Sequence, residues 1–436
     1  MNLRLFALLA VLTPLADQRA CPTRGFSLNP SSVTFPPRVV SQATRPSLPQ
    51  TVKLTSTGNV VINSLSSTSA SYSESNDCPL GTSMNPGTSC NISVTFAPQT
   101  LGVNSGGVLI QSNGFPRTLP LSGFGVLPVV ALRDSNGNSK ADIVWRHQAT
   151  GANALWLVSG LTLENAFLLP AVADLNWEIV GVGDFDGDGE ADILWRHVVN
   201  GQNLVWFLNG TGTLKGTASL PTVPTQNWQV SAVGDFNHDG IADIAWHDST
   251  SGKTAIWITG SLSGQKLNIA QSGLLPTVTD LNWHLVGGAD LDGDGNLDLV
   301  WRHLTTGDFA VWFVNATTLS SSKVFAKVPE NWQITAFGDF DGDGKTDIFL
   351  HDFDGHQNAV WLMNGSTIAG SALLPNEDYS VWQVAGAGDF DGDGKADLLW
   401  RNIATGENAV WLMDGANPLK GSGLLPTVPD ENWQVR

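Results

Sequence analysis

Residues 184–192 read Asp-Phe-Asp-Gly-Asp-Gly-Glu-Ala-Asp, with carboxylates at the first, third, fifth and ninth positions. Turn residues alternate with these carboxylates, so their side chains can converge on one point. Four unpaired carboxylates that close together would repel each other, and a hard divalent cation with many oxygen ligands relieves that repulsion. Calcium suits a flexible oxygen cage best. The glycines at the fourth and sixth positions allow sharp backbone turns with positive φ.

This loop recurs along the chain. Its first aspartate is found at positions 134, 184, 235, 290, 339 and 389, which are 50, 51, 55, 49 and 50 residues apart. A period in this range indicates a propeller or a solenoid. Each repeat reads as four short strands, and strands such as 193–195 are apolar at successive positions. Strands buried on both faces fit sheets stacked around an axis. The sequence therefore predicts an all-β protein whose C-terminal region is a β-propeller.

The loops differ in their predicted ligands. The seventh position is expected to contribute its carbonyl, so its side chain can vary, and the ninth is expected to bind through both oxygens. Four loops have the full carboxylate set: Asp184, Asp186, Asp188, Glu190 and Asp192; Asp290, Asp292, Asp294, Asn296 and Asp298; Asp339, Asp341, Asp343, Lys345 and Asp347; Asp389, Asp391, Asp393, Lys395 and Asp397. Another has one amide: Asp235, Asn237, Asp239, Ile241 and Asp243. The first is degraded, and we expect it to bind weakly or to be empty: Asp134, Asn136, Asn138, Lys140 and Asp142.

Residues 128–436 resemble the FG-GAP/VCBS repeats of the integrin α-chain propeller and its bacterial relatives, on the strength of these loops. In that family the nine-residue DxDxDGxxD loop is a calcium site that joins two strands of a blade. The resemblance implies up to six bound calcium ions, with the first loop in doubt.

The number of blades depends on the two ends of this region. Residues 432–436 repeat the first half of the opening strand, and no Asp loop follows them. The first repeat lacks that Trp-containing segment, so the C-terminal segment can complete it. This complementarity favours six blades; seven remain an alternative.

The N-terminal region has a different character. In residues 1–20 one basic residue, Arg4, precedes an apolar run, and small residues follow, as in a secretory signal peptide. A lipoprotein anchored at Cys21 is the alternative interpretation. No stretch of the sequence is long and apolar enough to predict a transmembrane helix.

Residues 26–125 contain no tryptophan and show alternating strands with frequent turns, which predicts a β-sandwich. In an exported protein the close pair Cys78 and Cys90 is expected to form a disulfide. The segments at 27–35, 51–59, 78–98 and 119–125 resemble the Ig-like modules of the ASPM/SPD-2/Hydin group. That resemblance implies an immunoglobulin-like spacer or interaction module.

The formal net charge of −18 argues against a nucleic-acid partner, which requires clustered Lys and Arg. The aspartates of the six loops make up 21 of the 40 Asp and Glu residues. Six calcium ions, each with two positive charges, would change the formal charge from −18 to −6. The acidity is therefore largely a property of the predicted metal loops.

Tryptophan recurs at three places in the repeat, as expected of blade cores. The Trp-Arg pairs that end the second strand offer a second interpretation, because an arginine of one blade can reach a tryptophan of the next and form a platform for sugars. The candidate ligand residues are Trp145, Arg146, Trp195, Arg196, Trp301, Arg302, Trp400 and Arg401.

Two functions fit these features. Catalytic groups are usually unique, whereas the histidines here mostly recur with the repeat, so we expect a non-enzyme. The first function is a secreted or cell-surface calcium-binding module for adhesion, with an extracellular protein or glycan as ligand. The alternative is an extracellular hydrolase or lyase that acts on polysaccharide.

Overall fold

The structure is a computed structural model that describes residues 25–35, 38–40, 47, 49–126, 131–417 and 419–436. These residues form strands and turns and contain no helix, so no membrane-spanning helix is found among them. The predicted signal peptide and Cys21 lie outside the described residues. The chain divides into a smaller unit, which includes Ser47–Phe96 and Ser105–Ser122, and a larger unit, which includes Gly123–Arg436.

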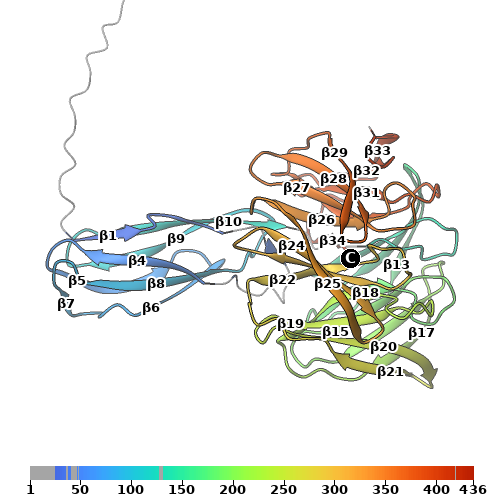
Figure 1. Cartoon of the computed structure of the whole chain (residues 1–436), viewed down its shortest axis with the longest axis horizontal. Helices are drawn as coiled ribbons and strands as arrows, with labels where there is room; N and C mark the ends of the chain where they lie inside the picture. Colours follow the sequence, from blue (N-terminus) through green and yellow to red (C-terminus); the bar gives the residue numbers. More distant parts are fainter. Residues whose placement is uncertain (1–24, 36–37, 41–46, 48, 127–130, 418) are drawn as a thin grey trace, which may run out of the picture. The chain divides into compact units, whose positions relative to one another are not determined.

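The smaller unit consists of two sheets (Figure 1, blue to cyan). The first sheet has the order β1 (Phe26–Asn29), β4 (Gln50–Ser56), β8 (Ser89–Phe96), β6 (Tyr72–Asn76). The second has the order β2 (Val33–Thr34), β10 (Arg117–Val126), β9 (Gly102–Ser112), β5 (Val60–Ser67), β7 (Ser83–Met84), and β3 (Arg38–Val39) also pairs with β10. One hydrophobic core contains side chains of both sheets, such as Ile92 and Ile110, so the sheets pack face to face.

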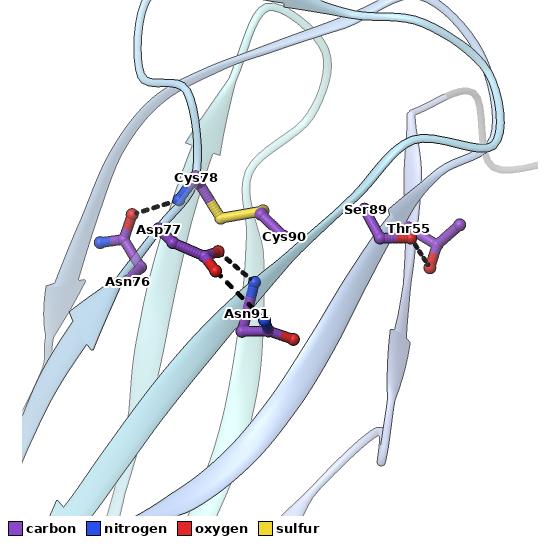
Figure 2. Close-up of a disulfide and its surroundings, with 7 residues drawn as sticks. All are labelled: Thr55, Asn76, Asp77, Cys78, Ser89, Cys90 and Asn91. Atoms are coloured by element: carbon purple, nitrogen blue, oxygen red, sulfur yellow. Dashed lines mark hydrogen bonds between the residues drawn. A yellow bond between two sulfur atoms is a disulfide. The ribbon is translucent and has the colours of Figure 1, made fainter.

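A disulfide joins Cys78 to Cys90 at one end of this core (Figure 2). The two Cα atoms are 4.9 Å apart. Next to the disulfide, the Asp77 carboxylate accepts hydrogen bonds from the backbone N–H and the side-chain amide of Asn91. The bridge and these bonds fix the segment between β6 and β8 against β8.

The described part of the larger unit contains six four-stranded repeats (Figure 1, green to red). Repeats 2 and 3 are joined into one eight-stranded sheet by a single pairing between β17 and β21. We number repeats 1 to 6 by their Asp loops, so that loop 1 is 134–142 and loop 6 is 389–397. Repeat 1 holds β11 (Ile143–His147), β12 (Asn153–Ser159), β13 (Thr162–Leu169) and β34 (Trp433–Val435). Repeat 2 holds β14 (Trp177–Gly183), β15 (Asp192–His197), β16 (Asn203–Leu208) and β17 (Leu214–Leu220); repeat 3 holds β18 (Trp228–Gly234), β19 (Asp243–Asp248), β20 (Lys253–Ser263) and β21 (Lys266–Leu274). Repeat 4 holds β22 (Trp283–Ala289), β23 (Asp298–His303), β24 (Asp308–Asn315) and β25 (Thr318–Lys327). Repeat 5 holds β26 (Trp332–Gly338), β27 (Asp347–Asp352), β28 (Gln357–Asn364) and β29 (Thr367–Leu374); repeat 6 holds β30 (Trp382–Gly388), β31 (Asp397–Asn402), β32 (Asn408–Leu412) and β33 (Gly421–Leu425).

Hydrophobic clusters lie between consecutive repeats, including repeats 6 and 1. In β11, Val144 packs in the cluster shared with repeat 2, whereas Ile143 and Trp145 pack in the cluster shared with repeat 6. The second strand of each repeat is therefore covered on both faces, which explains its continuous apolar sequence. Consecutive repeats thus pack against each other all the way around a closed ring.

The first strand of repeat 1 is built from two distant segments. β34 pairs with β11 so that Trp433 lies opposite His147, as Trp177 lies opposite His197 in repeat 2. The other half of that strand is the segment before loop 1, where Arg133 bridges to Asp142 as Gly183 pairs with Asp192. The C-terminal strand therefore completes repeat 1, in the way the sequence predicts.

Candidate calcium loops

Each Asp loop is shaped by hydrogen bonds to its own first aspartate. In loop 2, one oxygen of Asp184 accepts the N–H of Gly187 at 2.7 Å, and the other accepts the N–H of Gly189 at 2.8 Å. Both glycines have positive φ, of 78° and 86°. Loop 1 has the same shape although Ser139 replaces the second glycine, with φ 64°. In loop 3, where His238 takes the fourth position, one oxygen of Asp235 accepts the N–H groups of Asn237 and Asp239 instead. The bond from the sixth residue to the first aspartate is found in all six loops, whatever their number of carboxylates.

The ninth residue connects its loop to the third strand. One oxygen of Asp192 accepts the N–H of Phe185 at 2.9 Å, and the other accepts the N–H of Leu208 in β16 at 3.0 Å. The same pair of bonds is found at Asp142, Asp243, Asp298, Asp347 and Asp397. Burial raises the pKa of Asp192 to about 8 and that of Asp397 to about 7. A cation beside these carboxylates would oppose this effect, because it favours their charged form.

Carboxylate oxygens converge in the four loops that have a full set in the sequence. In each of these loops, single oxygens of three aspartates lie within 4.8 Å of one another. The groups are Asp184, Asp186 and Asp192; Asp290, Asp292 and Asp294; Asp339, Asp341 and Asp347; Asp389, Asp391 and Asp397. Among the described residues, loops 1 and 3 form no such group of carboxylates. The fifth position joins the group only in loop 4.

Unpaired buried oxygens show that the loops fit a cation. Asp186 Oδ1 and Asn237 Oδ1, at the third position of loops 2 and 3, are buried and accept no hydrogen bond. A buried acceptor without a donor is unfavourable, and an oxygen-binding ion supplies the missing partner. The oxygen-only donor set is the one that calcium prefers, and the residues of these loops would hold it.

Lysines that the sequence analysis did not connect with the loops contact the fifth position. Lys215 contacts Asp188, and its Nζ is 2.9 Å from Glu190. Lys420 Nζ lies 2.8 Å from Asp393. Both lysines are found in a Leu-Lys-Gly segment at the start of the fourth strand, at 214–216 and 419–421, and this shared pattern was the available signal. Their charge offsets part of the acidity of loops 2 and 6.

Backbone hydrogen bonds join each loop to the next around the ring. The N–H of the eighth residue donates to the carbonyl oxygen of the first aspartate of the preceding loop. The bonds are Ala191 to Asp134, Ala242 to Asp184, Leu297 to Asp235, Thr346 to Asp290, Ala396 to Asp339 and Ala141 to Asp389, at 2.6 to 2.8 Å. The last of these connects loop 6 to loop 1, so the loops form one closed set.

The Trp-Arg pairs lie at the other end of the second strand. The guanidinium carbon of Arg196 is 4.8 Å from the ring centre of Trp246 in the next repeat. Arg196 also donates to Asn203 Oδ1 at 3.0 Å and to the carbonyl oxygens of Val223 and Trp228 at 3.1 Å. Arg146 stacks in the same way on Trp195, and Arg401 on Trp145.

These contacts correct the interpretation of the pairs as a sugar platform. All eight side chains are at most 3% exposed, so no ring face is open to a ligand: Trp145, Arg146, Trp195, Arg196, Trp301, Arg302, Trp400 and Arg401. The tryptophans are core residues, and the arginines are buried between repeats. Closure of the ring covers both faces of the second strand, and strand alternation alone could not show this.

A family model described as FG-GAP-like repeat matches residues 184–246, 290–350 and 339–400. The matched stretches contain loops 2 to 6 and the second strands that follow them. No curated protein matches the sequence.

Solved structures similar to this chain share little sequence with it. A chain of the Photorhabdus luminescens Tc holotoxin pore has 16% identity and a TM-score of 0.41; the match covers 73% of this chain and only 17% of the toxin chain. A 6-phosphogluconolactonase-like protein from Bacteroides uniformis has 13% identity and a TM-score of 0.42, with 76% and 95% covered. The Cps50 (Swd1) β-propeller domain from Myceliophteria thermophila has 11% identity and a TM-score of 0.37, with 69% and 88% covered.

The ring of four-stranded repeats defines the larger unit as a β-propeller. Three stretches of this propeller match the FG-GAP-like repeat model, and several of its Asp clusters can hold metal ions.

Proposed function

We propose that the chain is a secreted or cell-surface, non-enzymatic protein that binds an extracellular protein or glycan through a calcium-stabilised, six-bladed propeller. The smaller unit serves as an Ig-like spacer. The observation that carries this proposal is the equivalence of the loops, which share one hydrogen-bonded shape and form one closed set. FG-GAP-like repeats are typical of extracellular proteins, which supports export.

Equivalence favours a structural role for calcium. A catalytic metal keeps a coordination position open and is served by unique neighbouring groups, whereas here the protein supplies repeated aspartates in copy after copy. Calcium in the loops would fix the turn between the first and second strands of each blade. The ligand would then bind to a face whose shape depends on the metal.

One region favours the alternative, a hydrolase or lyase that acts on extracellular polysaccharide. In repeat 5 the buried His351 stacks on Tyr379 with ring centres 3.6 Å apart, and the exposed His356 is 6.5 Å away. His351 Nε2 has no hydrogen-bond partner. This histidine pair is found in repeat 5 and is not repeated in the other blades. A catalytic group is expected to be unique in the same way. Among the described residues, however, it forms no cluster with carboxylates that could hold a metal.

A binding screen tests the proposal. The full chain would be applied to glycan and extracellular-matrix protein arrays in calcium and in EDTA, and incubated with the bound polysaccharides. We expect calcium-dependent retention of at least one ligand and no release of reducing or unsaturated ends. Cleavage that is lost in His351→Gln would establish the alternative. Retention unchanged by EDTA would contradict the role given to calcium.

A further inference from the structure

A hollow of about 400 Å³ lies where the Asp loops meet the ends of the first strands. Repeats 1, 2 and 3 and the first residue of loop 6 line it. Its apolar wall includes Leu132, Val182 and Ile241. The volume is sufficient for one sugar ring and its substituents.

Repeat 1 differs from the others at the residue just before the loop. That residue is small in the other five repeats: Gly183, Gly234, Ala289, Gly338 and Gly388. A Cβ atom at Gly183 would be 2.7 Å from the Cβ of Ala242, and one at Gly338 would be 2.5 Å from that of Ala396. The tight approach of neighbouring repeats therefore disfavours side chains here. In repeat 1 the residue is Arg133, and it lines the hollow.

The Arg133 side chain is free to bind a ligand. Arg133 is exposed and lines the hollow, and its guanidinium has no hydrogen-bond or ion-pair partner among the described residues. A guanidinium that lines a concave site and has no counter-ion is a strong donor to an oxyanion.

The aspartates that line the hollow form no ion pair with the Arg133 guanidinium. Asp134, Asp184, Asp235 and Asp389 each accept backbone N–H groups of their own loops. Their carboxylates are thus held toward the predicted metal sites. Calcium in the loops would further reduce the negative potential at the hollow, because each ion adds two positive charges.

We propose that this hollow binds the carboxylate of an acidic sugar residue, with Arg133 as the specificity-determining group and loaded calcium loops as a requirement. The inference rests on the proposed function and names the substrate class of its glycan ligand. The guanidinium pairs with the carboxylate through two parallel N–H···O bonds, and the apolar wall contacts the sugar ring.

Calorimetric titration of the calcium-loaded full chain with sodium D-glucuronate tests this proposal. We expect saturable binding of D-glucuronate and at least tenfold weaker binding of D-glucose, which lacks the carboxylate. Arg133→Gln should weaken glucuronate binding about tenfold, since one charge-assisted hydrogen bond contributes roughly 1.4 kcal/mol or more. Arg133→Lys keeps the charge but cannot form two parallel hydrogen bonds. Its affinity for glucuronate should therefore lie between those of the wild type and Arg133→Gln. EDTA should abolish the heat signal.

Two further variants keep the test decisive. Arg436→Gln is the matched control: Arg436 directly follows β34 and does not line the hollow, so its replacement should leave binding within twofold of wild type. Ile241→Glu places a carboxylate in the wall at a loop position where repeat 2 already has Glu190, so it should fold and repel the ligand. Melting curves would verify the fold of each variant.

The proposal is overturned if D-glucuronate does not bind the calcium-loaded wild type, if D-glucose binds equally well, or if Arg133→Gln binds unchanged. These results are distinguishable from failure of the proposed function. Array retention of a protein or a neutral glycan without glucuronate binding would leave the function and remove this site, whereas no retention on either array would remove the function itself.

Discussion

The second strand of each blade has two very different ends. β15 begins at Asp192, in an acidic loop that presents unpaired oxygens, and ends at Arg196 and His197, in a junction whose charged groups have partners within the protein. His197 Nε2, for example, is 3.1 Å from Asp174 of the preceding connection. The indole N–H groups of Trp195 and Trp246 are buried there without an acceptor. Both ends link neighbouring blades. The loop end depends on an ion for its charge balance, whereas the charged groups of the junction end need none.

The junction between repeats 4 and 5 departs from this rule. Phe309 replaces the asparagine acceptor, and Leu350 replaces the tryptophan of the next blade. Arg302 therefore stacks on Phe309 at 4.5 Å, and its Nε and Nη1 are buried without hydrogen-bond acceptors. A junction arginine is thus stabilising only where its acceptors are present.

Removal of calcium should have the largest effect, because it acts on the loop ends of the second strands. At a calcium concentration 100-fold above the dissociation constant, each occupied site adds about 2.7 kcal/mol, so four strong loops add roughly 11 kcal/mol. EDTA should lower the melting temperature of the propeller by well over 10 °C, measured by calorimetry, and excess calcium should restore it. The smaller unit serves as an internal control, because its melting should not change. A propeller transition that EDTA leaves in place would contradict the ion-dependent loop end.

Arg196→Met should show how much a hydrogen-bonded junction arginine contributes to the stability of the propeller. The change removes a buried cation and leaves Asn203 Oδ1 and two carbonyl oxygens without donors. We expect a loss of about 4 kcal/mol in the free energy of unfolding, measured with denaturant in saturating calcium. Calcium affinity should stay within a few-fold of wild type, because the loop lies at the opposite end of the strand.

Acid should weaken the junction between repeats 5 and 6. Burial lowers the pKa of His351 to about 4, below its unfolded value near 6.5, so the folded chain keeps it neutral. Neutral His351 therefore contributes about 3 kcal/mol to the free energy of unfolding. This contribution is complete above pH 6.5 and is lost as the pH falls toward 4. The difference in stability between wild type and His351→Gln should follow this curve in saturating calcium, where effects of the Asp loops cancel. A pH-independent difference would show that His351 does not titrate in this range.

Arg302→Met should have the smallest effect. The arginine donates one hydrogen bond, to the carbonyl oxygen of Pro329 at 2.9 Å, while two of its nitrogen atoms lack acceptors. Replacement of a poorly satisfied buried charge by an apolar side chain is often neutral or stabilising. We expect a change within about 1 kcal/mol. A loss as large as that of Arg196→Met would show that the two junctions are equivalent after all.

The loops were predictable because their chemistry is local. Nine residues contain the carboxylates and turn glycines, and a period near 50 residues repeats them, so the convergence of Asp184 and Asp186 follows from sequence alone. The hydrogen bond from Ala242 to Asp184 joins backbone groups of different repeats. Because no side chain takes part in it, the pattern of side chains along the sequence could not predict it. The role of Arg196 was also missed, since arginines are usually exposed. Its signal was Asn203, seven residues later, which recurs in three other repeats as Asn153, Asn358 and Asn408.

The composite strand of repeat 1 determines the order in which the blades can fold. His147 bonds with Asp430 across 283 residues of sequence, whereas blades 2 to 6 each form from one continuous segment. Contacts between distant segments form slowly, because the intervening chain must first be brought together. Blades 2 to 6 can therefore assemble while the chain is still emerging from the ribosome, and pairing of Trp433–Val435 with β11 must wait until residues 433–435 have been synthesised. Until then the edge of β11 is open to any strand that fits it, including the same segment of a second chain.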